Sequence, residues 1–275
     1  MPDLHAALDA IGQLPDAEID LADAALQLAR IDTPDADWLA TQAQLSRLAR
    51  AAAAMATDVA DHHLPAQAAA LTRLVCLEHR YHGSAEGYDK PERANLIRVV
   101  EQRCGLPVAL GVIWLHTARA AGWQAHGVDF PGHFLIALAA RGEQLVLDVF
   151  AGGTVLAARD LRALLKRVEG PKAELRPGLL QPMENRAVLL RLQQNIKLRR
   201  LHVGDIAGAL ACTADMLRFA PEEFSQWREA AVMHQRLDQV SAALRCYARF
   251  LQLAPKGPAT DRVQAAMDKL RSRLN

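Results

Sequence analysis

The sequence predicts an α+β protein that is mainly helical, with one small antiparallel sheet and a helical-hairpin array toward its C-terminal end. Three observations support this prediction. Amphipathic helical patterns fill the chain up to about residue 80, one segment between residues 123 and 150 alternates apolar and polar residues, and the last third contains a repeat. The many alanines and an aromatic content of 5% favour helix over sheet elsewhere.

Amphipathic helices are expected before residue 80. Asp20 stands where a carboxylate can cap the second of them. These helices should pack against the sheet, and no residue pattern in them predicts chemistry. Their expected ranges are Leu4 to Leu14, Leu21 to Ile31, Trp38 to Met55 and Leu64 to His79.

Two further helices precede the strands. The polar loop HGSAEGYDKPERAN leads into a helix expected from Glu92 to Arg103. A second helix, expected from Pro107 to Ala121, is almost continuously apolar and should be buried. Its ends are marked by a proline, which is tolerated at the first helical position, and by Gly122 just past the last residue.

A three-strand meander should follow the buried helix. If Arg141-Gly142 is a two-residue hairpin loop, Ala140 pairs with Glu143, and His133 and Asp148 become diagonal neighbours on one face. A hydrogen bond between the imidazole and the carboxylate is then within reach, whereas a three-residue loop would put them on opposite faces. The strands are expected at Trp123 to Phe130, His133 to Ala139 and Gln144 to Phe150, and the opposite face should collect Phe134, Ile136, Leu138, Leu145, Leu147 and Val149.

This order of a helix, a strand, a strand with His and a strand with Asp resembles the papain-like and transglutaminase-like core. The segments YDKPERANLIRVVEQR, RCGLPVALGVIW, GVDFPGHFLIAL and LDVFAGG more closely resemble the bacterial SirB-like family, which joins a transglutaminase-like core to a tail of tetratricopeptide (TPR) repeats. In the wider papain-like and transglutaminase-like core, a Cys at the start of the helix attacks a carbonyl, so that resemblance implies Cys104 as the nucleophile, His133 as the base and Asp148 as the residue that orients the imidazole.

The residue at the expected nucleophile position does not fit this mechanism. Counted back from the glycine that closes the helix, the nucleophile position of catalytic cores falls on Pro107, which has no reactive group. Cys104 lies three residues upstream and would reach His133 only if the intervening turn doubled back. We therefore favour a non-catalytic protein that binds or regulates. The open alternative is an amide- or peptide-bond hydrolase or transferase using Cys104 or an activated water.

The same resemblance implies that Tyr88, Asn95, Arg103 and Pro107 line a pocket. Local readings compete with this one: a turn for Tyr88, a helix cap for Asn95 and a solvated charge for Arg103. His62-His63 and the series Cys76, His79 and His82 do not have convincing spacing for chelation. No metal and no cofactor is expected.

The tail is predicted to be a TPR-like array. After a short helix, Ala158 to Val168, a Pro- and Gly-rich stretch suggests a division near Pro182, giving domains 1–182 and 183–275. Two similar segments end at Pro221 and Pro255, an offset of 255 − 221 = 34 residues, which is the TPR period. Cys212 and Cys246 become equivalent core thiols, and a last helix is expected from Asp261 to Leu274.

A protein or peptide partner is expected at the concave face of this array. Alternatively, the groove holds the protein's own core. The net charge is 3 − 10 = −7 over residues 1–60 and 15 − 8 = +7 over residues 186–275, but no motif indicates nucleic-acid binding. The start, Met1-Pro2-Asp3, lacks the basic residues of an export signal, and no apolar run is long enough to span a membrane. A cytoplasmic protein is therefore expected. The candidate contacts for a partner carboxylate are Lys197, Arg199, Arg200, Arg228 and Arg236.

Overall fold

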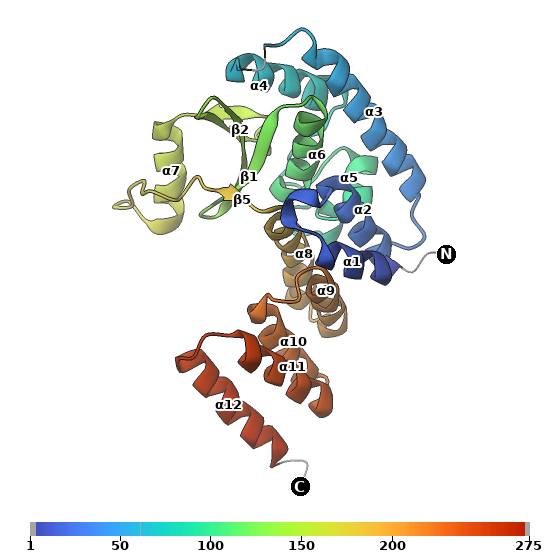
Figure 1. Cartoon of the computed structure of the whole chain (residues 1–275), viewed down its shortest axis with the longest axis vertical. Helices are drawn as coiled ribbons and strands as arrows, with labels where there is room; N and C mark the ends of the chain where they lie inside the picture. The colour runs from blue at the N-terminus through green and yellow to red at the C-terminus, as the bar shows by residue number, and fades with distance from the viewer. Residues whose placement is uncertain (1–3, 61, 273–275) are drawn as a thin grey trace. The chain divides into compact units, whose positions relative to one another are not determined.

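The computed structural model describes residues 4–60 and 62–272 of the chain. These residues form two compact units. The core unit is Pro15–Leu192, and the repeat unit is drawn from Met1–Leu14 and Gln193–Asn275 as far as these are described. Figure 1 labels the α-helices and three of the strands, β1, β2 and β5. Residues Met1-Pro2-Asp3, which lack the basic residues of an export signal, lie outside the described residues. So does Leu274, the predicted end of the last helix.

The helices of the core unit largely follow the predicted ranges. The second one is capped as expected, because the Asp20 carboxylate accepts hydrogen bonds from the backbone N–H groups of Ala22 and Asp23, both at 3.0 Å. The helical elements are η1 (Asp16–Glu18), α2 (Leu21–Asp32), α3 (Trp38–Ala56), α4 (Leu64–Thr72), η2 (Arg73–Glu78), η3 (Pro91–Arg93), α5 (Leu96–Gln102), α6 (Pro107–Ala120) and α7 (Ala158–Glu169).

Two predicted helices are interrupted. The expected helix from Leu64 to His79 changes at Arg73 into one wide π-helical turn, η2, a local defect that a hydrophobic pattern does not encode. The expected start at Glu92 is wrong: a single 3-10 turn comes first, and α5 begins only after Asn95, whose side chain caps it. Pro91 at the first position of the turn and an N-cap residue after it account for the break.

The sheet has five antiparallel strands in the order β4-β3-β2-β1-β5. The predicted hairpin is confirmed, because Ala140 pairs with Glu143 across Arg141-Gly142, and both loop residues have positive φ as a type I′ turn requires. The two short outer strands, β4 and β5, are not in the predicted meander. The strands are β1 (Gln124–Phe130), β2 (His133–Ala140), β3 (Glu143–Asp148), β4 (Thr154–Leu156) and β5 (Pro182–Met183).

Both faces of the sheet are covered, by α6 on one side and α7 on the other (Figure 1). On the α6 side a Cβ on Gly111 would lie 2.2 Å from the Phe134 ring, so this glycine lets helix and sheet approach closely. The predicted apolar face is confirmed, with Leu145 half-buried and the other five residues buried. The second face is apolar as well: Phe130, Leu135, Ala137 and Val146 pack with Leu161, Leu164 and Leu165 of α7.

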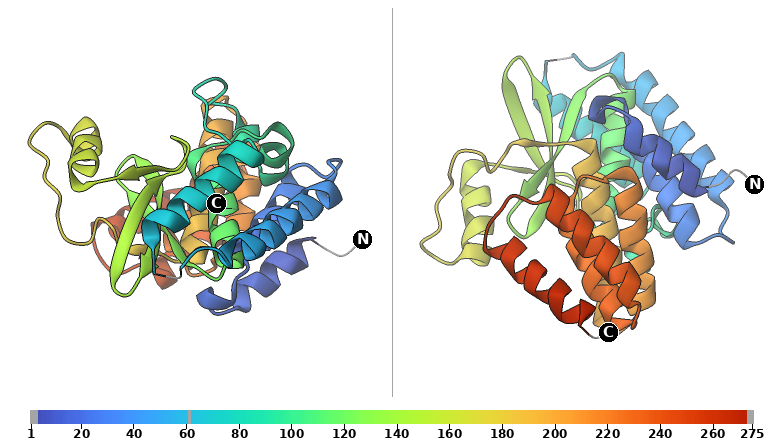
Figure 2. Two further views of the ribbon diagram at one scale, coloured as in Figure 1. Left: turned by 90° about the horizontal axis from the view of Figure 1, so that it is seen from above. Right: turned by 60° about the horizontal axis from the view of Figure 1, so that its bottom comes forward.

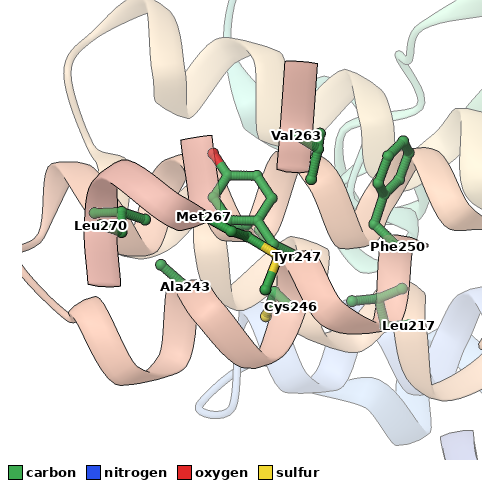
Figure 3. Packing of buried hydrophobic residues seen from close by; sticks show 10 residues of the cluster. Leu217, Ala243, Cys246, Tyr247, Phe250, Val263, Met267 and Leu270 are labelled. Carbon is green, nitrogen blue, oxygen red and sulfur yellow. The ribbon is translucent and has the colours of Figure 1, made fainter. Parts of the chain in front are cut away.

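The repeat unit consists of helical hairpins, as the 34-residue spacing predicts. Ala209 and its repeat mate Ala243 are both 0% exposed, and the thiols of Cys212 and Cys246 are both buried. Figures 1 and 2 show α10, α11 and α12 side by side, and Figure 3 shows Tyr247 and Met267 in the core between them. The helices are the latter part of α8 (Asn185–His202), α9 (Ile206–Phe219), α10 (Phe224–Arg236), α11 (Val240–Leu253) and α12 (Pro258–Arg271).

The first helix, α1 (Leu4–Gln13), packs on α9 of the repeat unit. The expectation that it packs against the sheet is therefore wrong. Leu8 is fully buried, Asp9 forms an ion pair of 2.8 Å with Arg218, and a Cβ on Gly12 would lie 2.4 Å from the Arg218 carbonyl oxygen. Amphipathicity predicts that a helix packs but not which surface it meets, because the partner lies far away in sequence.

Candidate functional site

His133 and Asp148 lie on the same face of the sheet. His133 begins β2 and is two residues from Leu135, and Asp148 ends β3 and is two residues from Val146. Leu135 and Val146 both pack against α7. Side chains two residues apart share a face, so both site residues point toward the α7 side. The turn that precedes His133 also meets this helix, because a Cβ on Gly132 would lie 2.7 Å from the Val168 side chain.

The carboxylate of Asp148 is engaged by the backbone. One of its oxygens accepts hydrogen bonds from the N–H groups of Phe150 at 3.0 Å and Ala151 at 3.1 Å. Within the described residues no hydrogen bond joins it to His133. The expectation that the register would pair the imidazole with the carboxylate is not met, because Asp148 ends its strand and closes the following turn instead.

The surroundings of His133 lower the pKa of its imidazole. Partial burial lowers its pKa below the ordinary value, the Asp148 carboxylate raises it, and the Arg167 guanidinium of α7 lowers it again. Burial has the largest effect, so the net change of the pKa is downward. A neutral imidazole can accept a proton, but in the described structure it has no hydroxyl or thiol as a hydrogen-bond partner.

Cys104 is buried in the segment that precedes α6. It is 4% exposed and forms an isolated β-bridge with His82, where the His82 N–H donates to the Arg103 carbonyl oxygen at 3.0 Å. It precedes α6, which covers the sheet face opposite to His133. Among the described residues no hydrogen bond links the Cys104 sulfur to the imidazole.

Pro107 occupies the first position of α6, as the sequence predicts. The residue before it, Leu106, is 1% exposed, and its N–H donates to the Arg93 carbonyl oxygen at 2.8 Å. The Arg93 guanidinium in turn donates to the Cys104 carbonyl oxygen at 3.4 Å. The start of this helix is therefore packed by backbone and apolar groups.

Tyr88 lies on the polar loop before α5 and is 40% exposed. Its ring meets the Phe150 ring edge to face, with centroids 5.8 Å apart. Phe150 also packs on Gly83, where a Cβ would lie 2.3 Å from the ring. The contact between Tyr88 and Phe150 therefore packs the polar loop against the turn that follows β3.

Asn95 and Arg103 have structural contacts. Asn95 is 1% exposed, caps α5 by accepting from the Arg98 N–H at 3.2 Å, and donates to the Ala29 carbonyl oxygen at 3.2 Å. This geometry is that of a helix cap. The Arg103 guanidinium lies 4.8 Å from the centre of the Tyr81 ring and donates to the Tyr81 hydroxyl, so it is not a solvated charge. Whether either residue binds a ligand stays a prediction.

The basic residues of the repeat unit fall into two groups. Lys197 is 0% exposed and donates to Gln226 at 2.8 Å and Glu229 at 2.6 Å, so the expectation that it meets a partner's carboxylate is wrong. Arg199 and Arg200 bond to carbonyl oxygens of their own unit. The exposed residues Arg228 and Arg236 lie on α10, two turns apart.

Sequence reasoning missed a polar cluster between α3 and the end of α5. Gln44, which is 2% exposed, bonds to Arg47 and to His79. The only sequence signal for this cluster is that Gln44 is a polar residue on the apolar side of an amphipathic helix.

No group of three or more His, Cys, Asp or Glu residues that could hold a metal occurs in residues 4–60 and 62–272. Among the described helices, none is long and apolar enough to cross a membrane.

The fold and the hairpin register define a transglutaminase-like core, joined to helical repeats. Comparison with known families agrees: the transglutaminase-like superfamily matches residues 40–194, and the tetratricopeptide repeat matches residues 196–268. The chain belongs to the transglutaminase-like superfamily.

Its relatives are bacterial. A UPF0162 protein of Xylella fastidiosa (strain Temecula1) is 31% identical over 203 residues, covering 73% of this chain and 72% of the relative. A UPF0162 protein of Vibrio cholerae is 28% identical over 253 residues, covering 92% and 93%. Protein SirB1 of Salmonella typhimurium is 26% identical over 176 residues, covering 64% and 65%. These relatives confirm the resemblance to the SirB-like family. No solved structure matches the chain significantly.

Proposed function

We propose that this protein is a non-catalytic member of its superfamily that binds a protein or peptide partner. The observation that supports the proposal is the start of α6: Pro107, at the place where the resemblance expects the nucleophile, is the first residue of this helix, and Cys104 lies buried in a bridge to His82. Nucleophilic catalysis needs a thiolate within hydrogen-bond reach of a base. The imidazole of His133 has no thiol as a hydrogen-bond partner in the described structure.

Alkylation of the thiols tests the absence of catalysis. The protein is treated near neutral pH with iodoacetamide, and peptide mass mapping separates Cys104 from the other three cysteines. We expect Cys104 to react no faster than free glutathione, and equally fast in His133→Ala. Rapid stoichiometric labelling that His133→Ala abolishes would instead support a cysteine-dependent hydrolase or transferase.

The binding surface is proposed to lie on α10. Arg228, Val232 and Arg236 are exposed at successive turns of this helix, and Val232 is 39% exposed although it is apolar. Residues four apart share a helix face, so this stripe presents two cations around one apolar side chain. TPR repeats generally mediate protein interactions, and an acidic peptide with an apolar residue would match the stripe.

Peptide binding tests this surface. Fluorescently labelled peptides with the pattern acid, apolar residue, acid are titrated with the full chain and followed by anisotropy. We expect Arg228→Gln with Arg236→Gln to weaken binding at least tenfold. Arg245→Gln, an exposed arginine on α11, is the matched control and should change binding less than twofold. Equal losses in both variants would contradict the proposed surface.

A further inference from the structure

The polar cluster that sequence reasoning missed lies apart from His133 and Asp148. We call it the Gln44 cluster and define it as Gln44, Arg47, His79, Tyr81 and Arg103. Its two central members are rigidly placed, because Gln44 is 2% and Tyr81 is 1% exposed. The three others reach toward the surface: Arg47 is exposed, and His79 and Arg103 are half-buried.

Hydrogen bonds hold the two arginines in place. The Gln44 carbonyl oxygen accepts from Arg47 Nε at 3.0 Å and Nη2 at 2.5 Å. On the other side of the cluster, the Tyr81 hydroxyl accepts from Arg103 Nη1. Each guanidinium group is thus held by a buried neutral side chain, and both groups lie close enough to His79 and Tyr81 to lower the pKa of each.

The same bonds fix the proton on His79. Because the Gln44 oxygen accepts from Arg47, its Nε2 must donate to His79 Nδ1, at 2.9 Å. A ring nitrogen that accepts is unprotonated, so the neutral imidazole carries its proton on Nε2. Burial, Arg103 and Arg47 all lower the pKa of His79, while Glu78 raises it. The imidazole therefore offers an N–H donor.

The positive charge of the cluster has no counter-ion among the described residues. Arg47 and Arg103 form no ion pair there, and their hydrogen-bond partners are neutral. Glu78, the carboxylate that acts on His79, is paired with Arg73 at 3.3 Å. Burial raises the pKa of Tyr81, so its hydroxyl stays protonated and supplies no anion.

We propose that the Gln44 cluster binds a phosphate group, with Arg47 and Arg103 as paired guanidinium donors and His79 Nε2–H as a neutral one. Two planar guanidiniums match the oxygens of a phosphate better than those of a single carboxylate, because a phosphate carries nearly two charges and offers more acceptors. The phosphate is either free inorganic phosphate or the monoester of a larger molecule.

Titration of the full chain with inorganic phosphate tests the site. The imidazole signals of His79 are followed by NMR over pH 5 to 8, with binding measured by calorimetry. We expect saturable binding that raises the pKa of His79, because a bound anion stabilises the imidazolium. Arg47→Gln should weaken binding at least tenfold. Arg50→Gln, one turn further along α3 and also exposed, is the matched control and should change it less than twofold.

Further arms separate a phosphate site from general attraction to charge. Arg103→Lys keeps the charge but loses the planar donors, and we expect a loss of at least fivefold with unchanged thermal unfolding. Acetate should bind at least tenfold more weakly than phosphate. A phosphoserine peptide that binds tenfold more tightly than inorganic phosphate would identify a monoester as the ligand, and equal affinity would identify free phosphate. Absent binding, equal losses in Arg47→Gln and Arg50→Gln, or acetate binding as tightly as phosphate would overturn the proposal.

Discussion

Asp16 shows how one residue can hold a distant helix. Its carboxylate accepts hydrogen bonds from the backbone N–H groups of Asn185 at 2.7 Å and Arg186 at 2.8 Å, the first turn of α8. The Asn185 side chain returns a bond to the Asp16 carbonyl oxygen at 3.0 Å. The first N–H groups of a helix lack partners within it, and its dipole favours an anion there. Asp16 thus caps a helix from outside it.

Asp16→Ala should destabilise the core unit by about 1–2 kcal/mol, the usual cost of losing a helix cap. Urea unfolding followed by circular dichroism measures this change. Asp35→Ala removes an exposed carboxylate from the turn after α2 and serves as the control, with a change below about 0.5 kcal/mol. An equal effect of the two substitutions would contradict the capping role.

The histidines of the core unit should make its stability depend on pH. Burial lowers the pKa of His126 and of His133 in the folded protein, so the unfolded chain takes up these protons first as pH falls. Their stabilising contribution is complete above about pH 6.5 and is lost as pH falls toward the folded pKa values.

We expect the free energy of unfolding to decrease from pH 7 to pH 5, with each histidine contributing a slope of at most about 1.4 kcal/mol per pH unit. His126→Gln should make the slope shallower, and comparison with the wild type at the same pH removes the contribution of the carboxylates. Urea unfolding at several pH values gives both slopes. An unchanged slope in the variant would show that His126 titrates alike in both states.

Single-residue predictions succeeded where the evidence was local. The cap at Asp20 and the cap reading of Asn95 follow from a polar side chain just before an apolar helical pattern. The role of Asp16 could not be predicted, because its partner lies 169 residues away. The hydrogen bond expected between His133 and Asp148 failed, since register places backbones and does not decide between competing donors.

At the scale of elements, the contact between α6 and β2 depends on Gly111. Gly111→Ala should destabilise the core unit by about 1–3 kcal/mol, because its methyl group would overlap the Phe134 ring. Phe134→Leu in the same chain should recover part of this loss, and the double-mutant cycle from urea unfolding measures the coupling. Additive effects of the two substitutions would show that the ring does not limit the approach.

The ion pair between α8 and α10 is the second element-scale test. Lys197 is fully buried, and its partner Glu229 is 35% exposed. Lys197→Met should destabilise the repeat unit by about 1–3 kcal/mol, because it leaves the buried Gln226 amide and the partly exposed Glu229 carboxylate without their donor. Lys197→Met with Glu229→Leu should be less destabilising than the single change. Thermal unfolding compares the variants, and a double variant no better than the single one would contradict this account.

Elements with regular patterns were predicted and irregular ones were not. The hairpin at Arg141-Gly142 follows from its turn residues, and the buried helix from its proline and glycine ends. The strand β5 is two residues long and includes a proline, and the π-helical turn η2 has no distinct pattern. Both depend on tertiary contacts, which a single sequence does not display.

At the scale of the whole molecule, the repeat unit needs a helix from the other end of the sequence. Leu8→Ala removes a fully buried side chain of α1 and should destabilise this unit by about 2–5 kcal/mol. Trp227 is the tryptophan of the repeat unit, whereas Trp38, Trp114 and Trp123 belong to the core unit. Variants that keep only Trp227 therefore report the unfolding of the repeat unit by fluorescence.

The matched control for this test is Ala6→Gly on the exposed side of the same helix, which lowers helix propensity by about 1 kcal/mol without removing a core contact. A loss in Leu8→Ala no larger than in this control would contradict the role of α1. The 34-residue spacing predicted the hairpins, but it contains no information on a helix outside the repeat.

The contact between Asp9 and Arg218 spans 209 residues, which has a consequence for biosynthesis. At typical translation rates, about 10–40 s separate the emergence of these two residues from the ribosome. During that interval α1 carries an apolar side chain with no native place to bury it. A nascent chain arrested before α9 should therefore expose this helix to chaperones or proteases, while the completed chain protects it.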